Sequence, residues 1–367
     1  MGQEIPFLYQ QSPLRIDYSG RNLVRMNLNE NLVLPRTFLR SALARCTDGL
    51  DPSYYPSSSE EGEILELRNE IARYCRCSTD SVAIGNGSDQ AIDLLLRSQL
   101  RKRTDALVTI EPTFSMYRIL AARLGSKSIV ISTRASTDEE PFSLNFEKVE
   151  SACKRSEAKL LVLASPNNPT GVQYPIEEIR GLIESQSNKT VMIDEAYVEY
   201  GDYTIVRQLA EYPNLVISRT FSKAFGLASF RLGYLVSSNI PLIKEIGGNL
   251  QYPYPISGLT AMVAIHVLRR KEIVLGCAEK TKEYREEMVE SLRKFENHLR
   301  VLPNSRANFV LVHSSKAKKI AQDLLSRYGI AVKYLPRLGL ERNFLRITVG
   351  TREQNERLLY ALRRILV

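Results

Sequence analysis

The stretch NLVISRTFSKAFGLASFRLGY, residues 214–234, decides the fold because it joins a strand to a turn that carries reactive side chains. It opens with a short apolar, β-branched run and passes through serine and threonine to Lys223. Small residues and glycines follow, and Arg231 stands eight positions after the lysine. Apolar β-branched runs predict buried strands, and Ser/Gly-rich residues predict turns. We therefore expect Lys223 at the mouth of a sheet, where its amine can form a Schiff base.

Two further stretches place polar side chains just after an apolar run or in a loop, as the first stretch does with Lys223. Residues 190–193, TVMI, form another apolar run that leads into Asp194, and Tyr197 follows three residues later. The loop SPNNPTG, residues 165–171, is rigid and carries the amide of Asn168. A Schiff-base lysine and an acid for a pyridinium nitrogen are what a protein supplies to pyridoxal phosphate chemistry. The sequence therefore indicates a site for pyridoxal phosphate.

Strand-like and helical patterns alternate from about residue 81 to residue 236, and 367 residues are more than one core usually holds. This alternation predicts an α/β fold with a mainly parallel sheet flanked by helices and a cleft at the carboxyl ends of the strands. A long helical region at 258–295 then precedes a smaller α+β unit. We expect an N-terminal arm at 1–40, a large cofactor-binding domain at 41–245 and a small C-terminal domain at 246–367.

Composition argues against several classes of protein, among them nucleic-acid-binding, membrane-spanning and metal-binding proteins. The formal charge is +9, but the basic residues are scattered among 41 acids, which argues against a nucleic-acid partner. No apolar stretch approaches the roughly 20 residues of a membrane span, and the first residues do not resemble a signal peptide. The five cysteines are odd in number and sparse, and they show no metal-ligand spacing. We expect a cytoplasmic protein with reduced thiols, no metal site and no membrane association.

Several short motifs occur in a fixed order along the chain. They are NLNEN at 27–31, YP at 55–56, GSD at 87–89, EPTFSMY at 111–117, SPNNPTG at 165–171, DEAY at 194–197, SK at 222–223 with Arg231, and LRITVGT at 345–351. Together they resemble the fold-type I, class I/II pyridoxal phosphate-dependent aminotransferases over essentially the whole chain. Within that class the chain is most similar to histidinol-phosphate aminotransferases.

The resemblance implies roles for the central residues. Lys223 holds the cofactor and, once released by substrate, moves the proton from the substrate α-carbon. Asp194 binds the protonated pyridine nitrogen through a charge-assisted hydrogen bond, which makes the ring a better electron sink. Tyr197 and Asn168 address the ring hydroxyl oxygen. Phe114 stacks on the ring at a position where the family usually has a tyrosine, so the stacking is kept but a hydroxyl is lost.

The cofactor phosphate needs hydrogen-bond donors. Gly87, Ser88 and Asp89 lie at an expected helix start, which offers backbone N–H groups and the positive end of a dipole. Ser222 and Arg231 complete the cradle from the other side, because a guanidinium suits phosphate. In this family Tyr55 reaches the phosphate from a neighbouring subunit, so the resemblance implies a homodimer.

Substrate binding is expected from the C-terminal unit. The family uses an arginine at the position of Arg346 to clamp the substrate anion. Histidinol-phosphate enzymes commonly carry a second arginine where this chain has Lys333, which keeps the charge but not the planar fork. Asn29 and Glu30, in the NLNEN motif, are also assigned to substrate binding.

The implied reaction exchanges an amino group between glutamate or 2-oxoglutarate and histidinol phosphate or imidazole-acetol phosphate, a step of histidine biosynthesis. Small-molecule donors and acceptors are therefore the expected partners. Three alternatives remain at this point: an aromatic amino-acid aminotransferase, a decarboxylase similar to threonine-phosphate decarboxylase, and a non-catalytic module that binds pyridoxal phosphate.

Overall fold

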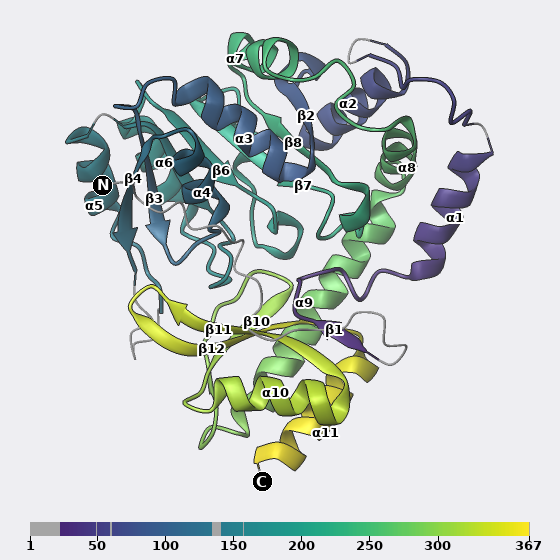
Figure 1. The fold of residues 1–367 in the computed structure, drawn as a ribbon, viewed down its shortest axis with the longest axis vertical. Coiled ribbons are helices and arrows are strands. Elements are labelled where there is room, and N and C mark those ends of the chain that lie inside the picture. Colours follow the sequence, from purple (N-terminus) through teal and green to yellow (C-terminus); the bar gives the residue numbers. More distant parts are fainter. Residues whose placement is uncertain (1–22, 49, 59–60, 134–140, 157, 367) are drawn as a thin grey trace.

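A computed structural model describes residues 23–48, 50–58, 61–133, 141–156 and 158–366 of the chain. Residues 1–22 of the expected N-terminal arm lie outside these ranges. Two sheets organise the described residues, and Figure 1 shows them one above the other with α9 passing between them. No helix in the described ranges is both long and apolar enough to cross a membrane.

The larger sheet of the described chain has seven strands in the order β2-β8-β7-β6-β5-β3-β4. Strand β8 runs antiparallel to its neighbours β2 and β7, and the other pairs of neighbouring strands in this sheet are parallel. The strands are β2 Val82–Asn86, β3 Ala106–Glu111, β4 Lys127–Ser132, β5 Ala158–Ala164, β6 Thr190–Asp194, β7 Leu215–Thr220 and β8 Leu232–Val236. The expected α/β fold with a mainly parallel sheet is confirmed.

Helices lie on both sides of this sheet, and α10 and α11 lie beside the smaller one (Figure 1). They are α1 Arg36–Thr47, α2 Gly62–Cys75, α3 Gly87–Gln99, α4 Met116–Arg123, α5 Phe146–Lys154, α6 Ile176–Ser185, α7 Ile240–Lys244, α8 Gly258–Leu268, α9 Lys271–Arg293, α10 Ala317–Tyr328 and α11 Arg352–Leu366. Single turns of 3-10 helix lie at Thr79–Ser81, Val198–Tyr200, Ile205–Gln208 and Ala228–Phe230, and a π-helical turn lies at Glu245–Asn249.

Alternate residues of the central strands enter different cores. Leu160 and Val162 of β5 pack in an apolar cluster with α3, whereas Leu161 and Leu163 pack in a second cluster that includes α6 and α8. Successive side chains of a strand point to opposite faces, so a strand buried on both faces is apolar throughout. This explains why the strand signals in the sequence are continuous apolar runs.

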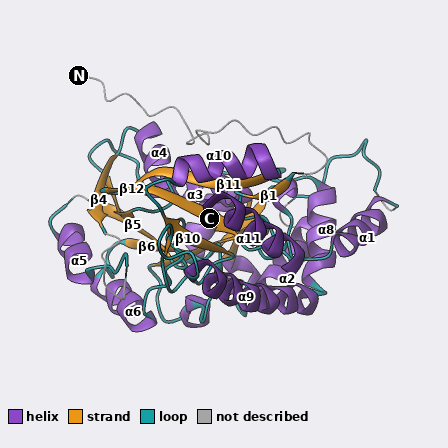
Figure 2. Cartoon of the chain, turned by 90° about the horizontal axis from the view of Figure 1, so that it is seen from below, coloured by secondary structure: helices purple, strands orange, loops and turns teal. Residues whose placement is uncertain are grey.

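The smaller sheet has the order β1-β11-β12-β10-β9 in the described chain. Its strands are β1 Val24–Met26, β9 Arg300–Val301, β10 Phe309–His313, β11 Ile330–Leu338 and β12 Glu341–Thr348. Figure 2 shows α10 and α11 lying over this sheet. Strand β1 pairs in parallel with β11, so the start of the described chain belongs to the C-terminal sheet. The domain boundaries near residues 40 and 245 stay predictions.

The helical region expected at 258–295 is two helices. α8 is apolar around its circumference and lies buried against α1 and α2. α9 has one buried face and one charged face, and it packs against the smaller sheet and α11. A uniformly apolar helix needs neighbours on all sides, whereas an amphipathic one needs them on a single face. The chain therefore turns at residues 269–270 instead of continuing one helix.

A buried ion pair lies at the carboxyl ends of β6 and β7, two central strands of the larger sheet. The Arg219 guanidinium donates to Glu195 Oε2 from Nε at 3.0 Å and from Nη2 at 2.6 Å, and the two side chains are 4% and 2% exposed. Glu195 Oε1 also accepts from Thr204 Oγ1 and from the Ile205 N–H, at 2.9 and 2.8 Å. This network fixes the residue that follows Asp194 in the chain.

Candidate active site

A cleft of about 1820 Å³ separates the two sheets at the carboxyl ends of the parallel strands. Ligand pockets commonly measure about 300–1,000 Å³, so this cleft has room for a cofactor and a substrate together. Most of the residues expected from the sequence line it: Asn29, Ser88, Asp89, Phe114, Asn168, Asp194, Tyr197, Ser222, Lys223, Arg231, Lys333 and Arg346.

Asp194 ends β6 with a nearly buried carboxylate, 5% exposed. Its Oδ2 accepts a hydrogen bond of 2.5 Å from the Tyr117 hydroxyl, and Oδ1 accepts one of 3.1 Å from the Ala196 N–H. Burial raises the pKa of Asp194 to about 6, while these two hydrogen bonds oppose the rise. At pH 7 the carboxylate is therefore mostly ionised and can accept a hydrogen bond from a further donor in the cleft.

Tyr117 had no predicted role, although it closes the EPTFSMY motif. It lies in the first turn of α4 and is fully buried. A tyrosine on the apolar face of a helix usually belongs to the core. The only sequence signal for more than packing was its place in a motif, because the hydrogen bond to Asp194 spans 77 residues.

Lys223 follows β7 in a turn, as expected, and contacts the segment after β1. Its Nζ donates to the Leu28 carbonyl at 3.2 Å and lies 5.5 Å from the centre of the Tyr197 ring. The Tyr197 hydroxyl accepts a hydrogen bond of 2.9 Å from Asn29 Nδ2. Asn29 has a φ of 56°, a left-handed conformation that asparagine adopts more readily than most residues. The segment after β1 thus orders two of the expected catalytic side chains.

The cradle expected for a phosphate surrounds the start of α3. Arg231 Nη1 donates to Ser222 Oγ at 3.4 Å, and its Nη2 donates to Asp89 Oδ2 at 3.1 Å. A Cβ on Gly87 would lie 2.5 Å from Arg231 Nη2, and Gly87 has a φ of 76°. Glycine is required here because it lets the guanidinium lie directly over the helix terminus. A guanidinium, a hydroxyl and helix N–H groups at one end of the cleft suit a phosphate.

Asn168 and Arg346 meet across the cleft. Arg346 Nη1 donates to Asn168 Oδ1 at 2.5 Å, and Nη2 donates to the Asn27 carbonyl at 3.0 Å. Because the arginine engages the amide oxygen, the Asn168 NH₂ is left to donate elsewhere. Lys333 stands opposite Arg346 in the pairing of β11 with β12, and burial together with the Arg346 charge lowers the pKa of Lys333. Two adjacent cations therefore line this end of the cleft.

Three expected residues do not line the cleft. Gly87 lies beneath Arg231, and Glu30 pairs with Arg25 at 2.6 Å. Tyr55 is 81% exposed and stacks on Tyr254 with ring centres 4.9 Å apart. Their contacts with cofactor or substrate stay predictions.

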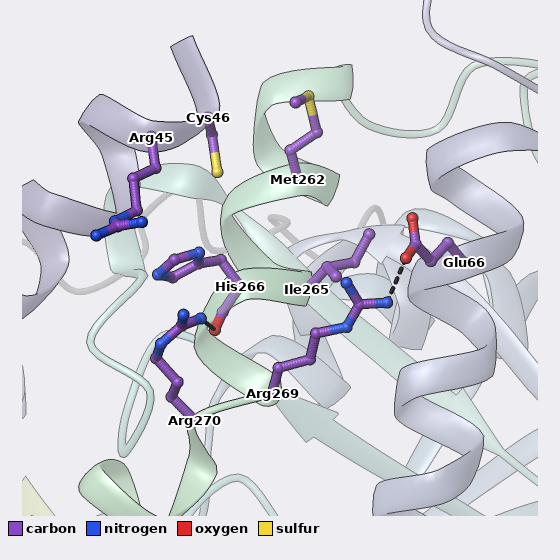
Figure 3. A pocket seen from close by; sticks show the side chains of 8 residues that line it. All are labelled: Arg45, Cys46, Glu66, Met262, Ile265, His266, Arg269 and Arg270. Atoms are coloured by element: carbon purple, nitrogen blue, oxygen red, sulfur yellow. Dashed lines mark hydrogen bonds and ion pairs between the residues drawn. The ribbon is translucent and has the colours of Figure 1, made fainter. Parts of the chain in front are cut away.

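A second, smaller cavity of about 460 Å³ lies between α1, α2 and α8 (Figure 3). Arg45 stands in the last turn of α1, where positive charge complements the negative end of the helix dipole. His266 stands in the last turn of α8, and burial with the neighbouring charges of Arg270 and Arg45 lowers its pKa. Arg269 pairs with Glu66 and Glu70. These basic groups have structural roles, and none of the expected site residues lines this cavity. The described residues contain no cluster of three metal-ligating side chains.

Comparisons with known proteins agree with this arrangement. The family described as aminotransferase class I and II matches residues 24–362. The histidinol-phosphate aminotransferase of Caldanaerobacter subterraneus subsp. tengcongensis is 33% identical over 348 residues, which are 93% of each chain.

Solved structures share the fold. The histidinol-phosphate aminotransferase of Sinorhizobium meliloti in complex with pyridoxal-5'-phosphate superposes with a TM-score of 0.81 at 23% identity, over 99% of both chains. The L-threonine-O-3-phosphate decarboxylase of Porphyromonas gingivalis superposes with a TM-score of 0.77 at 20% identity, over 94% of this chain and 99% of that one. Because both reactions occur on this fold, the fold alone does not choose between them.

Proposed function

The chain belongs to the class I and II aminotransferases, and from this premise we propose that it exchanges an amino group between glutamate or 2-oxoglutarate and histidinol phosphate or imidazole-acetol phosphate. Pyridoxal 5'-phosphate is the cofactor. The names of relatives such as that from Caldanaerobacter, at 33% identity over nearly the whole chain, support this substrate pair over the aromatic and decarboxylase alternatives.

One observation carries the proposal: a single cleft holds a buried carboxylate, a lysine, a phosphate cradle and two cations. Asp194 offers an anion for a pyridinium nitrogen, and Arg231 with Ser222 offers donors for a phosphate. A Cβ on Gly87 would lie 2.5 Å from Arg231 Nη2, and the φ of 76° at Gly87 favours glycine, which supports a cradle that is built into the fold. The residues present therefore fit the cofactor.

When bound, pyridoxal phosphate supplies an aldehyde for amino groups and a ring that withdraws electrons from the substrate α-carbon. The protein contributes position and charge. Lys223 would hold the cofactor through Nζ, and its amine, once free, would remove or return the proton at the substrate α-carbon. Asp194 keeps a negative charge against the ring nitrogen. Asn168 and Tyr197 would donate hydrogen bonds to the ring oxygen.

Arg346 and Lys333 bind the anionic end of the substrate in this proposal. They face each other on neighbouring strands, so their charges add at one place. Glutamate presents a carboxylate there, and histidinol phosphate presents a phosphate. Lys333 binds as a point charge without the bidentate geometry of arginine, which suits a pocket that must accept both groups.

The proposed function predicts the behaviour of the purified holoenzyme in an absorbance titration. Glutamate should bleach its visible band, and imidazole-acetol phosphate should restore it, because the two half-reactions are separate steps at one site. Recovery with phenylpyruvate but not with the imidazole phosphate would identify an aromatic aminotransferase instead. Release of carbon dioxide from threonine phosphate, without any need for 2-oxoglutarate, would identify a decarboxylase.

We also propose that the protein is a homodimer in which Tyr55 serves the partner's site. A tyrosine patch, defined here as Tyr54, Tyr55, Tyr252 and Tyr254, is exposed on one chain. Grouped large aromatic side chains on a surface are typical of protein interfaces. Tyr55 does not line the cleft of its own chain among the described residues, so the partner's site is the one it is available to serve.

Mixing two variants tests this shared site. Tyr55→Ala and Lys223→Ala should each be impaired, whereas co-refolded chains should regain roughly a quarter of the parent activity. Half of the randomly mixed dimers are hybrids, and each hybrid has one intact site of two. Activity is measured beside the mass of the assembly in solution. Hybrid dimers without regained activity would show that Tyr55 serves its own chain or neither.

A cytoplasmic location is part of the same proposal. All five cysteines are free, and three of them are buried. Free cysteines are usual in proteins of reducing compartments.

A further inference from the structure

We propose that Tyr117 is a positioning residue that holds the Asp194 carboxylate, through its hydroxyl, in the orientation and ionised form that the cofactor ring needs. The inference rests on the proposed function, because it concerns how this chain prepares Asp194 for a pyridinium nitrogen.

The geometry of the pair is specific. The hydroxyl of Tyr117 lies 2.5 Å from Asp194 Oδ2, and the Ala196 N–H donates to the other oxygen at 3.1 Å. Hydrogen bonds to an ionised acceptor are short and strong, and two donors on different oxygens fix the rotation of a carboxylate. Tyr117 comes from α4 and Asp194 from β6, so the contact joins two elements that are far apart in the sequence.

The alternative is that Tyr117 is an ordinary core tyrosine whose hydroxyl bonds to Asp194 only because a buried hydroxyl needs a partner. The hydroxyls of Tyr174 and Tyr200 are also buried, and neither has a hydrogen-bond partner among the described residues. A buried tyrosine hydroxyl in this fold therefore does not need a protein group as its partner. Tyr117 differs because its hydroxyl is aimed at a carboxylate that lines the cleft.

The surroundings of Asp194 make this donor necessary. Burial raises the pKa of Asp194, and the neighbouring acids Asp89 and Glu195 raise it further. The Tyr117 hydroxyl and the Ala196 N–H are the groups that lower it. Of these two donors, only Tyr117 acts through a side chain. If its hydroxyl is removed, only the Ala196 N–H is left to oppose the rise in the Asp194 pKa that burial and the two acids cause. Without the Tyr117 hydroxyl, Asp194 would take up a proton near neutral pH.

Cofactor affinity of the apoprotein measures the effect directly. Equilibrium dialysis against pyridoxal phosphate between pH 6 and pH 9 should show weaker binding by Tyr117→Phe than by the parent. The pH below which affinity falls should move up by about one to two units, because a lost hydrogen bond to a charged group is worth that shift. The loss should therefore be larger at pH 7 than at pH 9.

Tyr200→Phe is the matched control, since it removes an unpartnered buried hydroxyl and should leave the affinity and its pH profile unchanged. The double variant Tyr117→Phe/Asp194→Asn supplies a second test. If Tyr117 acts through Asp194, the tyrosine substitution changes affinity in the parent but has no further effect once Asp194→Asn is present. Thermal unfolding of each apoprotein reports whether the variants are folded.

The outcomes separate the inference from the proposed function. A Tyr117→Phe profile that superposes on the parent, or a shift equal to that of Tyr200→Phe, would overturn the positioning role. Equal effects of Tyr117→Phe with and without Asp194→Asn would overturn it as well, even if the single variant were destabilised. A parent protein that binds no pyridoxal phosphate would overturn the proposed function instead.

Discussion

Lys223→Ala should abolish the visible absorption of the lysine-bound cofactor and slow transamination by about 10²–10⁴-fold or more. A general base usually contributes a factor of about 10²–10⁴ to the rate. Lys223 Nζ contacts the Leu28 carbonyl and the Tyr197 ring at the mouth of the larger sheet. Alanine removes the amine that, in the proposed function, holds the cofactor and moves the substrate proton. Absorbance spectra and steady-state rates with glutamate measure both effects.

Lys319→Ala is the matched control for this prediction. Lys319 lies on α10 in an exposed ion pair with Asp323, so its loss should leave the spectrum and the rates unchanged. Retention of the lysine-bound spectrum by Lys223→Ala would show that another amine holds the cofactor. The whole assignment of the cleft would then have to be revised.

Glu195→Ala should destabilise the fold by about 3–5 kcal/mol, which is the usual effect of leaving one charge of a buried pair alone. The Arg219 guanidinium would remain buried without its carboxylate, and Thr204 and the Ile205 N–H would lose their acceptor. Natural proteins are stable by only about 5–15 kcal/mol, so this loss is a large fraction of the total. Urea unfolding of the apoprotein measures the free energy of unfolding.

Two further variants test whether the unpaired charge of Arg219 causes the loss of stability in Glu195→Ala. The double variant Glu195→Leu/Arg219→Met removes both charges and should be more stable than Glu195→Ala, since no unpaired charge is left buried. Breaking the exposed pair of Lys319 and Asp323 should change stability by less than about 1 kcal/mol. A change below about 1 kcal/mol in Glu195→Ala would show that solvent reaches Arg219.

The class of fold and the outline of the cleft could be predicted from the sequence. Continuous apolar runs with turn residues after them place Asp194 and Lys223 at the ends of β6 and β7. Parallel strands present their carboxyl ends at one edge of a sheet, so residues that follow different strands meet there without any further information. The glycine at residue 87 is likewise explained by a local need, since its φ of 76° is a left-handed conformation that glycine adopts without strain.

Other features could not be predicted, because the spacing of apolar residues does not show which element a strand or helix packs against. The sequence predicts an N-terminal arm at 1–40, but not that its strand β1 pairs with β11 more than 300 residues later. The composition of 258–295 predicts a helix, but the place where it turns depends on which neighbours cover α8. Hydrophobic spacing specifies the face of an element, and the packed structure specifies what that face meets.

The sequence by itself determined the α/β class, the alternation of elements and the strand ends that carry Asp194 and Lys223, because local hydrophobic patterns are enough to define them. Only the tertiary structure decided that Tyr117 donates to Asp194, that Asn29 donates to Tyr197 and that Arg346 orients Asn168. These are hydrogen bonds of about 3 Å or less between residues far apart in the chain. Their geometry follows from how helices and sheets pack, which no local pattern encodes.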